Sequence, residues 1–321
     1  MTTGRSPTHG TKVIAEERDE HPERRGRGPR REAVEPDKVL FPGAGLTKAD
    51  LIEYYERIAA VMLPHIAGRP LSLVRYPNGI EADGFMQKNA SDYFPDWIRR
   101  ARLAKQEGEV DHVVAEDAAT LVYLANQACV TFHIGLSRVD RIDHPDRMVI
   151  DLDPSDDGFA KVKWASREAR ALLEEVGLAP FLQTTGSRGL HIWVPLDGSA
   201  DFDQVRAFAA KVAELLVARR PRELTTAQRK AKRGDRVFVD IARNSYAQTA
   251  AAPYSVRARP QAPVATPIDW GELDDPKLEP QRYTIRNLFR RLARKEDPWA
   301  TIDRHARALE PARQRLESLP G

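Results

Sequence analysis

The sequence predicts an α+β fold, or mixed α/β fold, in which mixed and antiparallel sheets are flanked by helices. Apolar strand segments and amphipathic helix segments are interleaved along the 321 residues, but without a regular strand–helix repeat. Several strand segments follow one another closely enough to pair as hairpins. Both observations favour mixed sheets over a doubly wound parallel sheet.

Composition places the chain among globular proteins with an anionic partner. Hydrophobic residues make up 41% and charged residues 30% of the sequence, and arginines cluster although the net charge is only +3. No apolar run approaches the roughly 18 residues that a membrane span needs, and no apolar leader follows the first residues. The single cysteine, Cys129, excludes a disulfide framework and a cysteine zinc site. We therefore expect a cytoplasmic protein with no membrane partner.

Three segments are expected from the composition along the chain, and no internal repeat is visible. Residues 1–34 are rich in charged residues, glycine and proline, and are expected to be a disordered tail. Residues 35–280 are expected to form the folded domain. Residues 281–321 are expected to be an arginine-rich, helical C-terminal extension.

Order is predicted to begin near residues 37–42. Thr47 is a typical N-cap, and an apolar stripe formed by Leu51, Tyr55, Ile58 and Met62 predicts a helix after it. A strand is predicted over residues 71–75, a turn over 77–79, and a helix over 117–128.

The second half of the folded domain is predicted to contain most of the strands. Strands are expected over residues 129–134, 148–153, 181–184, 190–194 and 237–240. Helices are expected over residues 162–176, ended by Gly177, and over residues 202–219. Between the last helix and the last strand, residues 219–236 carry eight basic residues against two acidic ones.

Two carboxylates end the strand at residues 148–153. Asp151 and Asp153 are two residues apart, so both side chains project from one face of the strand. Two adjacent negative charges repel unless a cation lies between them. Asp240 ends another apolar strand, and three such carboxylates are what a two-metal phosphoryl-transfer site requires. The alternative is three solvated carboxylates at strand ends.

A glycine turn separates two of the predicted strands. Backbone N–H groups in such a turn can bind an anion, and Thr185, Ser187 and Arg188 add donors that suit phosphate oxygens. His191 begins the next strand. For the turn alone, the simpler interpretation is an ordinary connection between strands.

Further cations lie near these segments. The basic run that contains Arg233 leads directly into Asp240, and Arg257 follows in a proline-bounded segment. Such runs are usually solvated loops, but this position favours a phosphate-binding role. His133 lies within an apolar strand, and its spacing alone does not distinguish a site residue from an ordinary strand histidine.

Taken together and in order, these motifs resemble the polymerase domain of bacterial ATP-dependent ligase D, in the archaeo-eukaryotic primase superfamily. The resemblance extends from about Asp37 to about Leu278 and therefore covers the folded domain. Its landmarks are the segments at residues 37–42, 65–70, 75–79, 87–89, 151–154, 186–191, 237–240 and 252–257.

The resemblance implies a role for each matching residue. Catalysis and the binding of two divalent metals, Mn²⁺ or Mg²⁺, fall to Asp151, Asp153 and Asp240. Nucleotide binding falls to His133, Thr185, Ser187, Arg188, His191, Arg233 and Arg257. Capture of a DNA 5′-phosphate falls to Lys38 and Lys48, and stacking on the template base falls to Phe85.

The sequence departs from the family pattern at four positions. Thr185 and Arg188 stand where the family more often has serine and lysine, and both keep donor chemistry. Glu35 stands where relatives can have asparagine, which places a carboxylate beside the expected 5′-phosphate pocket. Met86 replaces the second of two aromatic residues that relatives often have.

The resemblance implies template-directed nucleotidyl transfer onto gapped or broken DNA by a stand-alone polymerase of this type. NTP or dNTP would be the second substrate, with ribonucleotides preferred, and Ku and an ATP-dependent DNA ligase are further candidate partners. End joining and excision-repair gap filling both remain open. A non-catalytic module that binds DNA ends and recruits ligase or Ku is the alternative, and a metal-dependent nuclease is a third interpretation.

Overall fold

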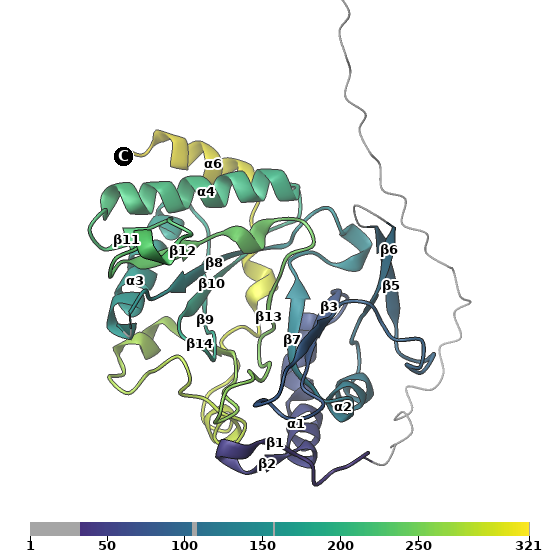
Figure 1. The fold of residues 1–321 in the computed structure, drawn as a ribbon. Coiled ribbons are helices and arrows are strands. Elements are labelled where there is room, and N and C mark those ends of the chain that lie inside the picture. Colours follow the sequence, from purple (N-terminus) through teal and green to yellow (C-terminus); the bar gives the residue numbers. More distant parts are fainter. Residues whose placement is uncertain (1–32, 105–107, 157, 321) are drawn as a thin grey trace, which may run out of the picture.

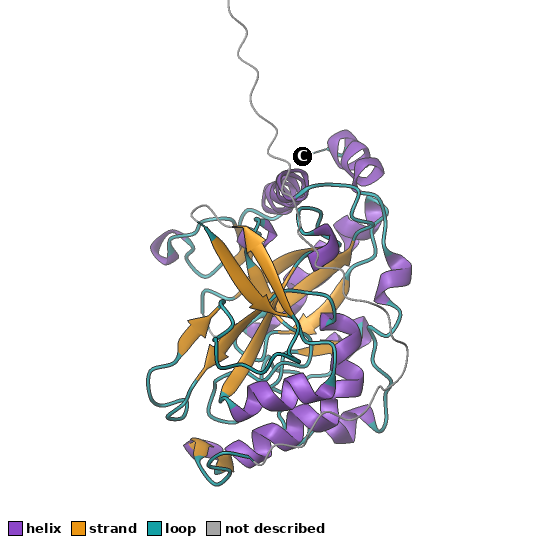
Figure 2. Cartoon of the chain, turned by 90° about the vertical axis from the view of Figure 1, so that its right-hand side faces the viewer, coloured by secondary structure: helices purple, strands orange, loops and turns teal. Residues whose placement is uncertain are grey.

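The computed structural model of this chain describes residues 33–104, 108–156 and 158–320. The tail predicted over residues 1–34 therefore lies outside the described residues except for its last two. Two larger sheets form the centre of the described part, with helices packed on their outer faces (Figures 1 and 2). The predicted class, a mixed α+β fold, is confirmed.

A six-stranded sheet forms one half of the molecule, in the order β11–β12–β8–β10–β9–β14. All its strand pairs are antiparallel except the parallel pair β11–β12. The strands are β8 (Arg147–Asp153), β9 (Phe181–Thr184), β10 (Leu190–Pro195), β11 (Leu224–Thr225), β12 (Val237–Asp240) and β14 (Thr266–Ile268).

A four-stranded antiparallel sheet forms the other half, in the order β13–β7–β3–β4. Its strands are β3 (Leu71–Arg75), β4 (Phe85–Gln87), β7 (Cys129–Gly135) and β13 (Thr249–Ala251). Two hairpins stand apart from the large sheets. They are β1 (Val39–Phe41) with β2 (Leu46–Thr47), and β5 (Arg100–Ala104) with β6 (Glu109–Val113).

The helices divide between the two sheets (Figure 1). α1 (Lys48–Ile66) and α2 (Ala118–Asn126) cover the four-stranded sheet, whereas α3 (Phe159–Glu175), α4 (Phe202–Arg219) and α6 (Leu309–Ser318) cover the six-stranded one. Thr47 caps α1 in a reciprocal capping box with Asp50, as its sequence predicts. The described helices include none that is both long and apolar enough to cross a membrane.

Alternation along β8 separates the core from the site. Met148, Ile150 and Leu152 pack into the hydrophobic cluster beneath α3 and α4. Val149 lies on the opposite face and belongs to the cluster of the four-stranded sheet. The side chains of Asp151 and Asp153 therefore point away from the helices and toward the space between the two sheets.

The C-terminal segment packs against both hydrophobic clusters. Trp299 and Ile302 belong to the cluster of the four-stranded sheet, while Leu309 and Leu316 belong to the cluster of the six-stranded sheet. Its helices are α5 (Leu288–Leu292) and α6, joined by irregular segments. Residues 281–320 are thus packed as part of the folded body, while the predicted three-part domain division stays a prediction.

Candidate active site

Three adjacent strands bring the central site residues into one row. Within the six-stranded sheet, Asp151 of β8 lies directly opposite Asp240 of β12 on one side and opposite His191 of β10 on the other. Directly paired residues point to the same face of a sheet. Residues 151, 191 and 240 therefore form a line across three strands, with Asp153 at the end of the same strand as Asp151.

A cavity of about 150 Å³ lies between the two sheets at this row. The six-stranded sheet contributes carboxylates and a histidine, and the four-stranded sheet contributes His133 and two alanines of β13. The lining residues are His133, Asp151, Asp153, Thr185, Ser187, His191, Arg243, Ala250, Ala251 and Arg257. Seven of these lining residues were predicted from sequence to bind metal or nucleotide, and Arg243, Ala250 and Ala251 join them.

Polar atoms at the bottom of this cavity lack partners. Asp151 and His191 are 7% and 5% exposed, and His191 Nε2 lies 3.4 Å from Asp151 Oδ2. Asp151 Oδ1 and His191 Nδ1 are buried without a hydrogen-bond partner. Buried polar groups are rarely left unpaired in folded proteins. These two atoms therefore mark a place where a ligand is needed to complete the bonding.

The two β8 carboxylates have opposite electrostatic surroundings. Burial opposes ionisation of Asp151, but His191, Arg243 and Arg257 outweigh it and lower its pKa. Burial, and then the negative charge of Asp151, raise the pKa of Asp153 to about 6. Burial disfavours the charged form of the carboxyl group, and repulsion from Asp151 adds to this effect. A cation bound beside both groups would remove the repulsion.

Two arginines supply positive charge to the cavity. Arg257 Nη1 donates to the backbone oxygen of Thr185 at 2.8 Å, and burial lowers the pKa of its guanidinium. Arg243 also lines the cavity, three residues after Asp240. Arg243 was not predicted from the sequence. Its position three residues after the candidate metal ligand Asp240 was the only sequence signal for it. The fold is what shows that its side chain lines the cavity.

His133 faces the cavity as a neutral imidazole. Burial, followed by the charges of Arg257 and Arg243, lowers the pKa of His133 to about 3. Protonation would place a further positive charge beside two arginines in low-dielectric surroundings, which is unfavourable. At neutral pH this side chain can thus donate or accept a hydrogen bond without carrying charge.

The glycine turn between β9 and β10 is braced from within. The N–H groups of Ser187 and Gly189 both donate to Thr185 Oγ1, at 3.2 and 3.1 Å. Gly186 has a φ of +62°, and a Cβ there would lie 2.8 Å from the Arg257 side chain. A Cβ on Gly189 would lie 2.0 Å from Leu152 O. Both glycines are therefore required, but the Thr185 hydroxyl is engaged inside the turn.

Two of the predicted nucleotide-binding arginines lie outside the cavity lining. Arg188 Nη2 donates to Pro154 O at 2.9 Å. Arg233 donates to the backbone oxygens of Ala227 and Gln228, and its guanidinium lies 3.7 Å from the centre of the Phe238 ring. Their roles stay predictions, since each side chain would have to exchange these contacts for phosphate.

The two lysines predicted to bind a 5′-phosphate already face a carboxylate. Lys38 Nζ lies 3.3 Å, and Lys48 Nζ 3.8 Å, from Glu35 Oε2. Lys48 is 5% exposed and also donates to Val34 O at 2.7 Å. Burial is the main reason that the pKa of Lys48 is lowered. We call Glu35, Lys38, Lys48 and the strands β1 and β2 the lysine hairpin. The carboxylate of Glu35 thus already occupies a position beside both lysines.

The predicted stacking residue and its neighbour lie on opposite faces of β4. Met86 lies opposite Val74 of β3, and Val74 lies opposite Thr131 of β7. Thr131 and His133 are two residues apart on β7, so Met86 lies on the same sheet face as His133. Phe85 pairs with Arg75 and lies on the other face. Both side chains are exposed, at 47% for Phe85 and 53% for Met86. Template stacking by Phe85 stays a prediction, and Met86 is the residue on the cavity face.

The donor chemistry of this cavity fits divalent metal. Carboxylate oxygens are the ligands that Mg²⁺ and Mn²⁺ prefer, and the unpartnered Asp151 Oδ1 lies among them. In the described part of the chain, however, no three histidine, cysteine, aspartate or glutamate side chains form a ready-made metal cluster. Asp240 Oδ1 accepts from Ala242 N at 2.8 Å instead. The residues therefore supply suitable donors rather than a preformed cage.

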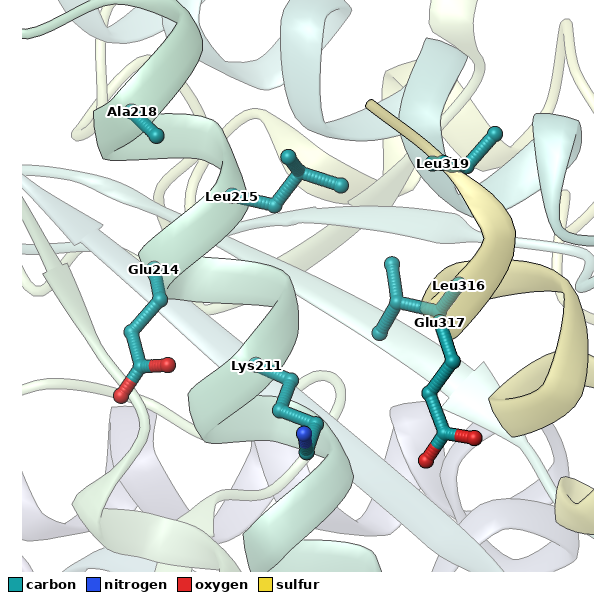
Figure 3. A pocket seen from close by; sticks show the side chains of 7 residues that line it. All are labelled: Lys211, Glu214, Leu215, Ala218, Leu316, Glu317 and Leu319. Carbon is teal, nitrogen blue, oxygen red and sulfur yellow. The ribbon is translucent and has the colours of Figure 1, made fainter. Parts of the chain in front are cut away.

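A larger hollow lies on the far side of the same sheet. It measures about 250 Å³ and lies between α4 and α6, where Leu215 and Leu316 approach each other beside Lys211 and Glu317 (Figure 3). This groove faces away from the carboxylates because α4 covers the opposite face of β8. The larger of these two hollows therefore lacks the carboxylates and arginines of the smaller one.

Comparison with known proteins gives one consistent result. The family model for the LigD primase-polymerase domain matches residues 47–299. The multifunctional non-homologous end joining protein LigD of Mycobacterium bovis is 36% identical over 281 residues, which are 84% of this chain and 36% of that protein. The bifunctional LigD of Bacillus subtilis is 30% identical and matches over 82% of this chain and 42% of its own length. This chain thus spans well under half the length of these relatives.

A solved structure resembles nearly the whole described body. The polymerase domain from Mycobacterium tuberculosis Ligase D, in complex with DNA, superimposes with a TM-score of 0.81 at 34% sequence identity. The match covers 86% of this chain and 99% of that one. The comparison of folds and the comparison of sequences therefore point to the same family.

Proposed function

This chain belongs to the LigD primase-polymerase domain family, and we propose that it is a template-directed nucleotidyltransferase acting at gaps or breaks in DNA. One observation carries the proposal. Two carboxylates of β8 and two arginines line a cavity of about 150 Å³ whose buried polar atoms lack partners, and a third carboxylate, Asp240, lies opposite Asp151 on the adjacent strand. Anionic and cationic groups side by side suit a substrate that brings both metal and triphosphate.

The chain's own residues have separate tasks in this mechanism. Asp151, Asp153 and Asp240 would hold two divalent metals, Mn²⁺ or Mg²⁺. Such metals, when bound, lower the pKa of a primer 3′-hydroxyl and neutralise a triphosphate and its leaving pyrophosphate. Arg243 and Arg257, which also line the cavity, would screen the phosphate charges. No protein nucleophile is needed.

The remaining predicted residues would place the nucleotide. Neutral His133 can hydrogen-bond the sugar or a phosphate without repelling the arginines. His191, held by Asp151, keeps Nδ1 available toward the cavity. Thr185 acts through the shape of the turn, whereas Ser187 keeps its hydroxyl at the cavity edge. Arg188 and Arg233 would join once phosphate displaces their backbone contacts.

Finer features of the activity are also part of this proposal. We expect ribonucleotides to be preferred, a 5′-phosphate to be recognised by the lysine hairpin, and Ku and an ATP-dependent ligase to be partners. The names of the relatives refer to non-homologous end joining, which supports a role at DNA breaks. We accordingly expect this chain to act in the cytoplasm, in association with the nucleoid.

Extension of gapped DNA tests the proposal. The substrate is a duplex with a one-nucleotide gap and a 5′-phosphate, supplied with ribonucleotides or deoxynucleotides under Mg²⁺ or Mn²⁺. We expect growth of the primer by the templated nucleotide, fastest with ribonucleotides. Tight binding without growth under any condition would instead indicate the alternative, a non-catalytic end-binding module. Primer shortening would indicate a nuclease.

A further inference from the structure

The arginine-rich C-terminal segment has a place in the fold that the catalytic proposal does not use. We define the arginine track as four arginines, Arg259, Arg282, Arg286 and Arg290. All four side chains are exposed. The last three lie in the segment that leads into and through α5, and the first lies in the loop paired with that segment.

One end of the track touches the catalytic turn. Arg259 Nη2 donates to Ser187 Oγ at 3.1 Å, and Gln281 Nε2 donates to Ser187 O at 2.9 Å. Ser187 itself lines the cavity that contains Asp151. The track therefore starts at the edge of the proposed triphosphate site.

The other end of the track reaches the lysine hairpin. Arg286 Nη2 donates to Ala44 O at 2.6 Å, and Gln261 Nε2 donates to Gly43 O at 3.2 Å. Residues 43 and 44 lie between strands β1 and β2. Figure 1 likewise shows the yellow-green segment around α5 beside the purple β1–β2 hairpin.

Backbone pairing holds the two halves of the track together. Pro263 and Thr284 form an antiparallel bridge, and Ile285 N donates to Ala262 O at 3.2 Å. The loop that carries Arg259 and the segment that carries Arg282 and Arg286 thus run side by side. A continuous ribbon of chain connects the catalytic turn to the lysine hairpin.

The charges of the track are available to a ligand. Within residues 33–104, 108–156 and 158–320, none of its four arginines forms an ion pair with a carboxylate. Arginines on the outer helices differ, since Arg313 pairs with Glu310 and Glu317, and Arg170 pairs with Glu174. Unpaired guanidinium groups in a row, on a fixed ribbon, suit an extended polyanion.

We propose that the arginine track binds the sugar–phosphate backbone of double-stranded DNA between the cavity and the lysine hairpin. This inference rests on the proposed function, because it assigns a path to the DNA of that reaction. The contacts are to phosphates, so binding along the track is independent of base sequence. Each neutralised phosphate releases condensed counterions and steepens the salt dependence of affinity.

Salt dependence of binding tests the track directly. Affinity of the full chain for 5′-phosphorylated, one-nucleotide-gapped DNA is measured by fluorescence anisotropy from 50 to 300 mM KCl, without nucleotide. The double variant Arg282→Gln/Arg290→Gln leaves every described side-chain hydrogen bond of the track in place. The matched control is Arg170→Gln/Arg313→Gln, which removes the same charge from the outer helices.

Each lost phosphate contact should reduce the slope of log affinity against log salt by roughly 0.9. We therefore expect the track variant to lose between about one and two units of slope, and the control to match the wild type. Adding Arg286→Gln should reduce the slope further, with melting temperature recorded to detect unfolding. Parallel salt plots for the wild type, the track variant and the control would overturn the proposal.

Failure of the track and failure of the proposed function give different results. If the wild type extends gapped DNA but the track variant keeps the wild-type slope, only the track is refuted. If the wild type neither extends the primer nor prefers gapped DNA over intact duplex, the function on which the track rests is refuted as well.

Discussion

The catalytic cavity and the lysine hairpin are both charged sites, but they differ in how their charges are satisfied. In the cavity, Asp151 Oδ1 and His191 Nδ1 are buried without partners, and burial together with the charge of Asp151 raises the pKa of Asp153 to about 6. In the hairpin, Lys38 and Lys48 share the carboxylate of Glu35.

This difference indicates how each site meets its ligand. Unpaired polar atoms in a buried cavity are costly unless a ligand completes them, so the cavity gains stability when it is filled. In the hairpin an anion is already present, and a DNA phosphate has to displace it. Substitutions in the cavity should therefore change activity more than substitutions in the hairpin.

Removing one carboxylate from the row should nearly abolish catalysis. Asp151→Asn and Asp240→Asn each take away charge that holds metal, and metal supplies several kcal/mol of transition-state stabilisation. We expect primer extension to fall by about a thousandfold or more. Binding to gapped DNA, measured by anisotropy, should change little. Extension by either variant at the wild-type rate would show that these carboxylates are not metal ligands.

Removing a cavity arginine should weaken nucleotide binding more than DNA binding. A hydrogen bond to a charged group contributes about 1.5–3 kcal/mol, so Arg243→Gln should raise the KM for nucleotide by about ten- to a hundredfold. Arg257→Gln should do the same and also loosen the turn at Thr185. The control is Arg206→Gln on the exposed face of α4. An unchanged KM in Arg243→Gln would exclude this residue from the triphosphate site.

Metal alone should stabilise the protein through the cavity. A ligand at 100 times its Kd adds about 2.7 kcal/mol to the free energy of unfolding. Mn²⁺ should thus raise the melting temperature of the wild type by several degrees, and that of Asp151→Asn much less. Glu35→Gln, altered only in the hairpin, should respond like the wild type. Equal shifts in wild type and Asp151→Asn would place Mn²⁺ elsewhere.

Freeing the lysines from Glu35 should give the smallest effect. Partly exposed ion pairs contribute at most about 1 kcal/mol, so Glu35→Gln should increase the preference for 5′-phosphorylated over 5′-hydroxyl gapped DNA by up to about fivefold. Glu53→Gln, which breaks the pair with Arg57 on α1, is the matched control. A preference lower in Glu35→Gln than in Glu53→Gln would mean that Glu35 assists phosphate binding.

Much of the fold was predictable because its elements are encoded locally. The apolar stripe before Met62 and the capping residue Thr47 predicted α1, which extends four residues further than the stripe, to Ile66. The placement of Asp151 and Asp153 on one face followed from strand alternation. Short strands such as β13 and β14 were not predicted, because three residues carry too little periodicity.

The fold class, the shared face of the two β8 carboxylates and, through the order of its motifs, the family were all predictable from the sequence. Which distant residues meet depends on the three-dimensional fold. It placed Asp240 beside Asp151, brought Arg243 into the cavity, set Glu35 between two lysines and placed Met86 rather than Phe85 on the sheet face that carries His133. Alternation of side chains along a strand is a local property that neighbouring residues set. Strand order and register, in contrast, depend on long-range packing across the whole chain.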